Sequence, residues 1–247
     1  MTKQAKKPND DQTDRSILIN FVLDKSGSMD HLCEATISGF NEFKNDQAPE
    51  DGEAFFTLTL FDTQFHTVCN GVPVREVLDL DADKYAPGGM TALYDAIGHT
   101  MRLTDDFVAA HKPDQVLFVI MTDGEENSSR EFSRDRVFQM IQDRQNLAHY
   151  EFIYLGANQD SYMVGQDMGL RPGRTLDYAA SPQGSREVML RASHNVRAHR
   201  RHGEKTRDQF FSAEMDRLGA IEGADWKAMS PEERKRHLEE KGDQASA

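Results

Sequence analysis

Runs of apolar and β-branched residues recur along the chain, separated by segments in which apolar residues fall at helical spacing. The runs are predicted to be strands, at residues 16–23, 54–61, 65–69, 115–121, 151–155 and 174–178. Strands that alternate with helices are typical of a mostly parallel α/β sheet. Asp62 and Thr63 make a tight turn between two of the runs, which predicts a hairpin and one antiparallel strand. The run 115–121 is the most hydrophobic and is expected to be central.

Helices are predicted between these strands. Three are marked by apolar residues three or four positions apart, at Cys33, Ile37 and Phe40, at Leu93, Ile97 and Met101, and at Val137, Met140 and Ile141. A short helix over 161–168 is expected to end at Gly169. Another is expected to begin at Pro182, after Ser181 as its N-cap residue.

The chain of 247 residues is expected to fold as one domain over residues 15–202 with a short appendage. The polar residues 1–14 are interpreted as a disordered tail. Strand signals stop at about Gly203, so residues 203–247 are interpreted as a helical extension, with a capping-box helix start at 230–233.

Charge and cysteine content limit which cellular compartment and which classes of binding partner are expected. Residues 1–196 carry 18 basic and 31 acidic residues, which accounts for the whole formal charge of −13. Such a domain repels phosphates, so no nucleic-acid partner is expected. The N-terminus lacks the apolar stretch of a secretory signal, and no apolar run approaches the roughly 20 residues that cross a bilayer. We therefore expect a cytoplasmic protein without a membrane partner, in which Cys33 and Cys69 are reduced.

Three short polar segments each follow a predicted strand or precede a predicted helix. They are residues 24–28 (DKSGS), 88–91 (GGMT) and 122–124 (TDG). In an open α/β sheet such turns lie at the carboxyl ends of the strands, where ligands bind. The three segments are therefore expected to meet at one edge of the sheet.

Five side chains in these segments can offer oxygen atoms to a cation: Asp24, Ser26, Ser28, Thr91 and Asp123. Carboxylates and hydroxyls, without sulfur or imidazole, suit a hard cation rather than zinc. Two carboxylates do not close the coordination shell, and Mg²⁺ keeps waters or accepts an outside oxygen. The sequence therefore predicts a site for Mg²⁺, with Mn²⁺ or Ca²⁺ as alternatives.

The same residues give the chain a resemblance to a known family. Asp24, Ser26 and Ser28 match the D-x-S-x-S signature of von Willebrand factor type A (vWA) domains. Thr91 matches the lone threonine of the family, and Asp123 matches its last aspartate. The resemblance covers residues 15–200. The sequence around these motifs is similar to that of bacterial and phage members of the family. It implies a Rossmann-like three-layer fold with strand order 3-2-1-4-5-6 and one antiparallel edge strand.

In that family these five residues form the metal-ion-dependent adhesion site (MIDAS). The resemblance implies that Ser26 and Ser28 bind the ion directly. It also implies that Asp24, Thr91 and Asp123 bind it directly or through water. The last position is taken by a glutamate or aspartate of a partner protein, so the resemblance implies an adhesion or assembly module.

The alternative function is a Mg²⁺-dependent hydrolase of the haloacid dehalogenase type. Such phosphatases and phosphotransferases resemble D-x-D-x-T, in which the second aspartate is the acid/base. Here Ser26 takes that position, and no well-placed substitute is evident. A serine hydrolase is also disfavoured, because Gly-x-Ser-x-Gly is absent. We therefore expect no enzymatic activity.

The other polar clusters in the sequence are not expected to bind a ligand. Glu125 and Glu126 follow Asp123 closely and are interpreted as solvated, with a supporting role around the metal ligands as the alternative. The acidic run 78–83 is expected to be a solvated loop. The basic residues at 197–201 are expected to favour the C-terminal end of their own helix. The nine histidines show no zinc-site spacing.

Overall fold

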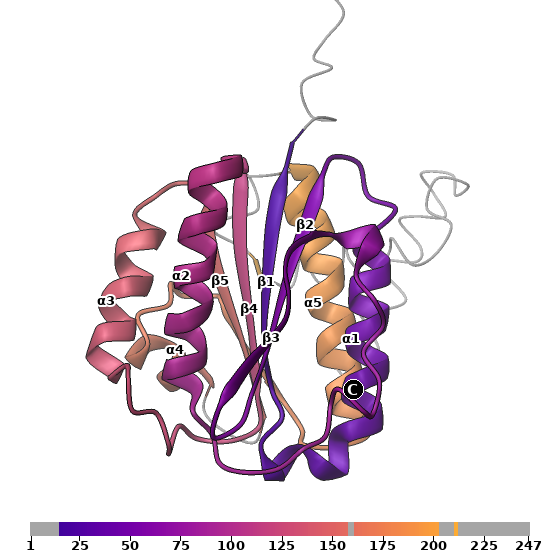
Figure 1. Ribbon diagram of the computed structural model, residues 1–247, viewed down its shortest axis with the longest axis vertical. Coiled ribbons are helices and arrows are strands. Elements are labelled where there is room, and N and C mark those ends of the chain that lie inside the picture. The colour runs from indigo at the N-terminus through magenta and orange to yellow at the C-terminus, as the bar shows by residue number, and fades with distance from the viewer. Residues whose placement is uncertain (1–14, 158–160, 203–209, 212–247) are drawn as a thin grey trace, which may run out of the picture.

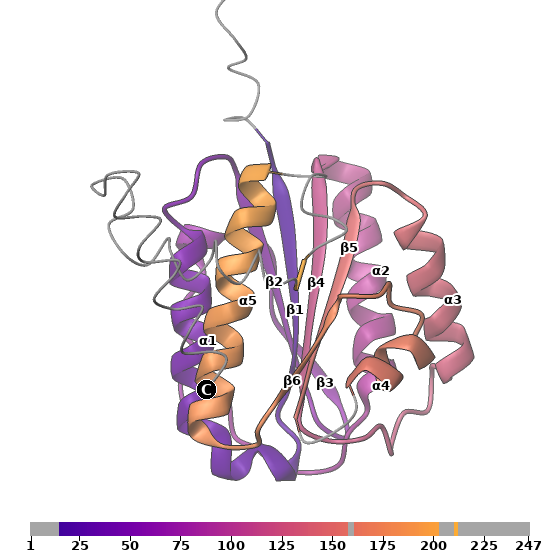
Figure 2. The same ribbon diagram turned by 180° about the vertical axis from the view of Figure 1, so that it is seen from behind.

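The computed structural model describes residues 15–157, 161–202 and 210–211, which form a six-stranded sheet between two layers of helices (Figures 1 and 2). The strands run in the order β3-β2-β1-β4-β5-β6, with β3 antiparallel to β2 and the other pairs parallel. Their bounds are β1 Ile17–Asp24, β2 Ala54–Phe61, β3 Phe65–Pro73, β4 Gln115–Thr122, β5 Tyr150–Ala157 and β6 Thr175–Tyr178. The predicted fold class and strand order are therefore confirmed.

Helices cover both faces of the sheet, α1 and α5 on one face and α2, α3 and α4 on the other (Figures 1 and 2). Their bounds are α1 Cys33–Gln47, α2 Leu93–His111, α3 Arg134–Gln145, α4 Ser161–Asp167 and α5 Pro182–His202, with short 3-10 helices η1 Gly27–Leu32 and η2 Val74–Glu76. Gly169 follows α4 with a φ of 83°, as predicted for its C′ residue. The Ser181 hydroxyl accepts the Gly184 N–H at 3.1 Å, which confirms the N-cap of α5.

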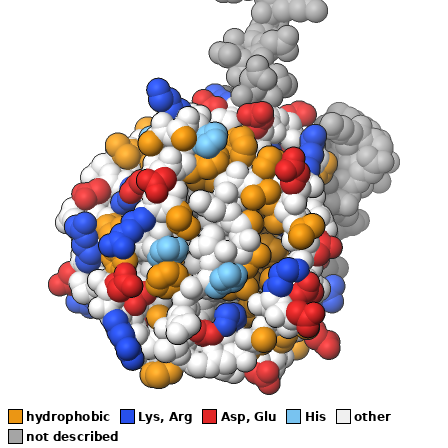
Figure 3. Space-filling model, in the orientation of Figure 1, with side chains coloured by type: hydrophobic (Ala, Val, Ile, Leu, Met, Phe, Trp, Pro, Cys, Tyr) orange, Lys and Arg blue, Asp and Glu red, His pale blue; other side chains and the backbone are white. Residues whose placement is uncertain are grey.

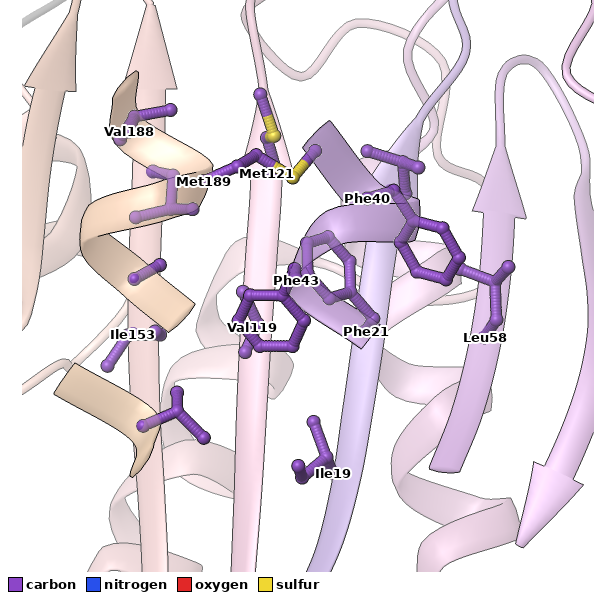
Figure 4. Packing of buried hydrophobic residues seen from close by; sticks show 14 of the residues in the cluster. Ile19, Phe21, Phe40, Phe43, Leu58, Val119, Met121, Ile153, Val188 and Met189 are labelled. Atoms are coloured by element: carbon purple, nitrogen blue, oxygen red, sulfur yellow. The ribbon is translucent and has the colours of Figure 1, made fainter. Parts of the chain in front are cut away.

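Aromatic packing fixes the central strand β1 against α1 (Figure 4). Phe21 of β1 makes edge-to-face contacts with Phe40 and Phe43 of α1, with ring centroids 5.4 and 5.2 Å apart. All three rings are at most 1% exposed. Aromatic pairs of this kind add to the stabilisation from burial alone. The packing therefore holds in place the strand that ends at Asp24.

The edge strand β3 is longer than predicted, because it continues through Asn70 and Gly71 to Pro73. Asn-Gly usually indicates a turn. Here the register of β3 on β2 shifts beside these residues, and Gly71 has a φ of 61°. The dipeptide therefore forms an irregularity within the strand instead of ending it.

Replacing Gly71 with alanine is expected to destabilise the fold more than replacing Gly173. Both glycines have positive φ, of 61° and 73°, which costs other residues about 1–2 kcal/mol. An added Cβ at Gly71 would lie 2.3 Å from the Phe107 ring, whereas at Gly173 it meets nothing within 4 Å. Urea unfolding should place Gly71→Ala about 1 kcal/mol below Gly173→Ala. Equal losses in the free energy of unfolding would show that the contact with Phe107 adds nothing to the cost of the Gly71 substitution.

The basic residues at 197–201 lie at the C-terminal end of α5, as predicted, and two of them also bind a neighbouring helix end. Arg200 is 7% exposed, and its guanidinium donates to the Gln47 carbonyl at 2.6 Å. Arg201 forms a two-pronged ion pair with Glu50, at 2.7 and 2.6 Å. These arginines therefore bind the C-terminal end of α1 and the residues after it, where orphan carbonyls attract cations. The predicted position at a helix end is therefore confirmed, and the contacts with the end of α1 were not predicted.

The predicted tail at 1–14 lies outside the described residues, as does 203–247 apart from Phe210 and Phe211. Phe210 is fully buried, and its carbonyl accepts the Asn195 amide at 2.9 Å. The chain therefore returns to the domain after α5. Within the described ranges, the helices are too short or too polar to cross a bilayer. On the face in Figure 3, basic side chains lie among acidic ones.

Candidate metal centre

The three polar segments meet at the carboxyl edge of the sheet, at the lower end of Figure 1. Asp24 ends β1, and Asp123 follows β4 directly. Thr91 lies two residues before α2. Two backbone hydrogen bonds join the first two segments, from Gly27 N–H to the Gly89 carbonyl at 3.2 Å and from Gly88 N–H to the Lys25 carbonyl at 2.9 Å. The sheet and these bonds together bring the segments side by side.

Glycine is required at position 89 for this close approach. Its φ is 73°, and an added Cβ would lie 2.7 Å from the Thr63 hydroxyl oxygen. That hydroxyl also accepts the Met90 N–H at 2.8 Å. The turn before Thr91 therefore rests on the β2–β3 hairpin.

Asp24 is the buried carboxylate of the site, with no exposed surface. One oxygen accepts the Ser26 N–H at 2.6 Å and the other accepts the Thr122 hydroxyl at 2.5 Å. Burial removes the carboxylate from water and raises the pKa of Asp24 to about 6, and the nearby charge of Asp123 acts in the same direction. Burial of a carboxylate charge is costly unless an opposite charge lies close to it. A bound cation would supply that compensation.

The hydroxyls continue from Asp24 toward the solvent. The Ser26 and Ser28 oxygens are 3.1 Å apart, and the Ser28 hydroxyl donates to Asp123 at 2.6 Å. Gly124 closes the group, since an added Cβ there would lie 3.3 Å from the Thr91 hydroxyl oxygen and 3.6 Å from that of Ser28. Ser28 is exposed and Asp123 half-buried, whereas Ser26 and Thr91 are buried. The structure therefore brings all five predicted residues together, with one side open to solvent.

The donor set fits a hard divalent cation. It consists of two carboxylates and three hydroxyls. In residues 15–157, 161–202 and 210–211, no group of three or more His, Cys, Asp or Glu side chains is placed to hold a metal. A site rich in imidazole, thiolate or carboxylate therefore does not compete within that part of the chain. Oxygen ligands of this kind suit Mg²⁺, Mn²⁺ or Ca²⁺.

The position of Ser26 also bears on the hydrolase alternative. A phosphatase of the D-x-D-x-T kind needs a second carboxylate two residues after the first, as its acid/base. Ser26 stands at that position, and its hydroxyl oxygen lies beside that of Ser28. A serine hydroxyl is a poor proton donor or acceptor at neutral pH. The arrangement therefore favours binding an ion over transferring protons.

Two side chains that hold Asp24 were not predicted from the sequence. The Thr122 hydroxyl donates to the Asp24 carboxylate, and the buried Tyr85 hydroxyl donates to the Asp24 backbone carbonyl at 2.5 Å. Burial raises the pKa of Tyr85 well above its ordinary value, so the phenol stays protonated as a donor. A threonine at the end of a strand carries little signal, and Tyr85 is 61 residues from Asp24.

Glu126 differs from the prediction of a solvated residue. Its carboxylate accepts hydrogen bonds from the backbone N–H groups of Tyr94, Ser128 and Ser129, at 2.7 to 2.9 Å, and from the Ser129 hydroxyl at 2.7 Å. It therefore organises the loop between β4 and α3 and ties it to α2. Glu125 is exposed, as expected.

Replacing Thr122 with valine is expected to weaken Mg²⁺ binding by about 10-fold. Valine has a similar shape but cannot orient the Asp24 carboxylate, and lost partners of metal ligands typically cost 10–100-fold in affinity. Thr104→Val is the matched control, because Thr104 is a buried threonine that donates to Asn20 at 3.0 Å. Calorimetry should show a lower affinity for Thr122→Val alone. An unchanged affinity would mean that Thr122 does not position the site.

No family model matches the sequence, and a search of curated proteins by sequence finds no match. Solved structures do match the fold. The pilus adhesin SpaC from Lactobacillus rhamnosus GG aligns with a TM-score of 0.57 and 13% identity, over 74% of this chain and 30% of its own. The vWF domain of the type V pili tip protein Mfa5 from Porphyromonas gingivalis aligns with a TM-score of 0.56 and 9% identity, over 77% and 98%.

Proximal thread matrix protein 1 from the mussel byssus aligns with a TM-score of 0.54 and 13% identity, over 71% of this chain and 46% of its own. Another structure of that mussel protein has a zinc-occupied MIDAS motif, with a TM-score of 0.52. The chain thus spans less than half of the mussel protein and under a third of SpaC. At identities of 9–13%, these similarities establish the fold. The chain has the fold of a von Willebrand factor A domain.

Proposed function

We propose that this chain is a divalent-metal-dependent protein-binding module, in which Mg²⁺ held by the five-residue site coordinates a carboxylate of a partner protein. The observation that carries the proposal is the convergence of Asp24, Asp123 and three hydroxyls at an edge of the sheet that is open to solvent. A bound Mg²⁺ would supply the charge that polarises an incoming oxygen. With one oxygen from each, the five side chains offer too few oxygens to close an octahedral shell, so the ion can exchange a water for an oxygen of the partner.

The five residues of the site differ in their exposure to solvent and so in their expected roles. Asp24 is buried, and the Thr122 hydroxyl and the Ser26 N–H hold its carboxylate in place, so it would bind the ion from the protein interior. Ser28 and Asp123 lie on the side facing solvent, where a partner can approach. The zinc-occupied MIDAS motif of the mussel protein and the adhesive role of SpaC support a metal-dependent binding role here.

The surface of the partner around its carboxylate is proposed to be neutral or basic. Residues 1–196 carry 31 acidic and 18 basic residues, so an acidic partner would be repelled within the Debye length of about 8 Å at physiological salt. A basic surround would speed the encounter, while the bond to the metal sets the lifetime of the complex. Removing the metal should therefore raise the dissociation rate far more than it changes the association rate.

The carboxylate step is tested directly on the Mn²⁺-loaded protein. Acetate should displace a water from the bound ion and lower the relaxation enhancement of water protons saturably. Acetamide, which has the same shape without the charge, should have little effect. If acetate leaves the enhancement unchanged, the ion does not accept a carboxylate and the proposal fails. Metal-dependent hydrolysis of a phosphate ester that is lost in Asp24→Asn would favour the hydrolase instead.

A further inference from the structure

A small pocket lies beside the metal centre and is not used by it. Its volume is about 250 Å³, and its lining includes Gly124, where an added Cβ would lie 3.3 Å from the Thr91 hydroxyl oxygen and 3.6 Å from that of Ser28. The other walls come from the first turn of α2, the loop between β4 and α3, and α4. Sites for drug-sized ligands occupy roughly 300–1,000 Å³. This pocket therefore has the size for a single side chain.

The pocket has an apolar floor. Leu93, Tyr154 and Met168 line it and are at most 2% exposed. Val164 of α4 adds a half-buried aliphatic wall. A side chain that enters here would lay its carbon atoms against Val164 and the half-buried ring of Tyr94, with the three buried residues behind them. The stems of lysine and arginine pack in this way while their charged ends stay near water.

The rim of the pocket is acidic. Glu125, Glu126 and Asp167 contribute three negative charges, and Arg134 contributes one positive charge. Arg134 is already shared between acids, with its guanidinium 3.7 Å from Asp167 and 3.6 Å from Asp135. The rim therefore keeps a net negative charge and disfavours an anionic occupant.

The pKa of Tyr94 responds to this negative charge. Burial raises the pKa of Tyr94, the negative charge of Glu126 raises it further, and Arg134 opposes the shift less strongly than Glu126 favours it. A bound Mg²⁺ would not reverse the balance, because its charge is matched by Asp24 and Asp123. A cationic group can therefore occupy the rim while the metal site is loaded.

We propose that this pocket receives a lysine or arginine side chain of the same partner whose carboxylate binds the metal. The inference rests on the proposed function and narrows its partner to a segment that carries an acidic residue and a basic residue close together. The carboxylate would bind at the Ser28 side of Gly124 and the basic side chain would enter on the other side. The pair would fix the direction in which the partner segment lies.

The pocket can be tested with n-pentylammonium, which reproduces a lysine side chain, on the ¹⁵N-labelled full chain. The amide signals of Gly124 and Glu125 should shift saturably, and n-pentanol should bind about fivefold more weakly, the upper end for a solvent-accessible ion pair. The double variant Glu125→Gln/Asp167→Asn should lose this preference. Asp106→Asn is the matched control, because Asp106 is exposed on α2 about 18 Å along the helix from Tyr94. Binding of pentanol as tight as that of the ammonium would overturn the proposal.

The link to the metal is tested with peptides in which none to three glycines separate an aspartate from a lysine. In Mg²⁺, one spacing should bind about fivefold more tightly than its norleucine counterpart, and the double variant should abolish the difference. If no spacing prefers lysine although the aspartate peptides bind, the inference fails and the proposed function stands. If aspartate peptides bind no better than asparagine peptides, the proposed function fails and the inference falls with it. The ammonium titration then reports on the pocket alone.

Discussion

Mg²⁺ is expected to raise the melting temperature of the wild-type protein by about 5–10 °C at 100 times its dissociation constant, and Asp24→Ala is expected to abolish this rise. A ligand at that excess stabilises the native state by about 2.7 kcal/mol. In a domain of this size each kcal/mol shifts the melting temperature by about 2–4 °C. Asp24 supplies one of the two carboxylates of the site, so its loss leaves too little charge to hold the ion.

Without metal, the melting temperature of Asp24→Ala depends on two opposing effects, because Asp24 is buried. Its burial opposes ionisation, as the raised pKa of about 6 shows. Asp24→Ala therefore removes an unfavourable buried charge and also leaves the Thr122 hydroxyl and the Ser26 N–H without their acceptor. These effects oppose each other, so the comparison rests on the Mg²⁺-induced shift and not on the melting temperature itself.

Two further variants sharpen the Asp24 result. Asp24→Asn keeps the shape and one acceptor oxygen but removes the charge, and it should lose Mg²⁺ binding while it stays folded. Asp30→Ala removes an exposed carboxylate from η1, in the same loop, and should bind Mg²⁺ as the wild type does. If calorimetry gives Asp24→Ala and the wild type the same affinity, the metal site has been assigned to the wrong residues.

The sequence predicted the candidate site because its residues lie in segments next to strands. Each of the segments that carry Asp24, Thr91 and Asp123 adjoins a strand or helix that its own apolar pattern reveals. The parallel strands β1 and β4 end at a common edge, and α2, which leads into β4, begins at that edge, so the three segments are expected to meet there. The close contacts between them, such as Ser28 with Asp123 at 2.6 Å, follow from that topology.

Side chains that act across long distances in the chain could not be predicted. Tyr85 lies in a loop before α2 and reaches the end of β1, and Glu126 gathers N–H groups from its own loop and from Tyr94. Nothing local to either residue indicates its partner. The charged residues Glu151 and Arg174 were placed at the starts of predicted strands, where charge is common. They form a buried ion pair between β5 and the residue directly before β6.

Replacing Arg174 with methionine is expected to lower the free energy of unfolding by about 3–5 kcal/mol, because the buried Glu151 carboxylate would lose the guanidinium that compensates its charge. The guanidinium contacts both carboxylate oxygens, at 2.6 and 3.2 Å, and both side chains are at most 3% exposed. Phe210 lies over the pair, with its ring centroid 5.7 Å from the guanidinium carbon. The pair is therefore shielded from water in the native fold, and denaturant unfolding should report the loss.

The double variant Glu151→Leu/Arg174→Met should recover most of that loss. Replacing a buried ion pair with apolar residues of similar volume is often neutral or stabilising. A double variant as unstable as Arg174→Met would show that the arginine stabilises the fold through other contacts, such as the one with Phe210. The pair lies near the amino ends of β5 and β6, whereas the metal centre lies at the carboxyl ends of β1 and β4. Folded Arg174→Met should therefore bind Mg²⁺ as tightly as the wild type, which separates the stability of the sheet from the chemistry at its opposite edge.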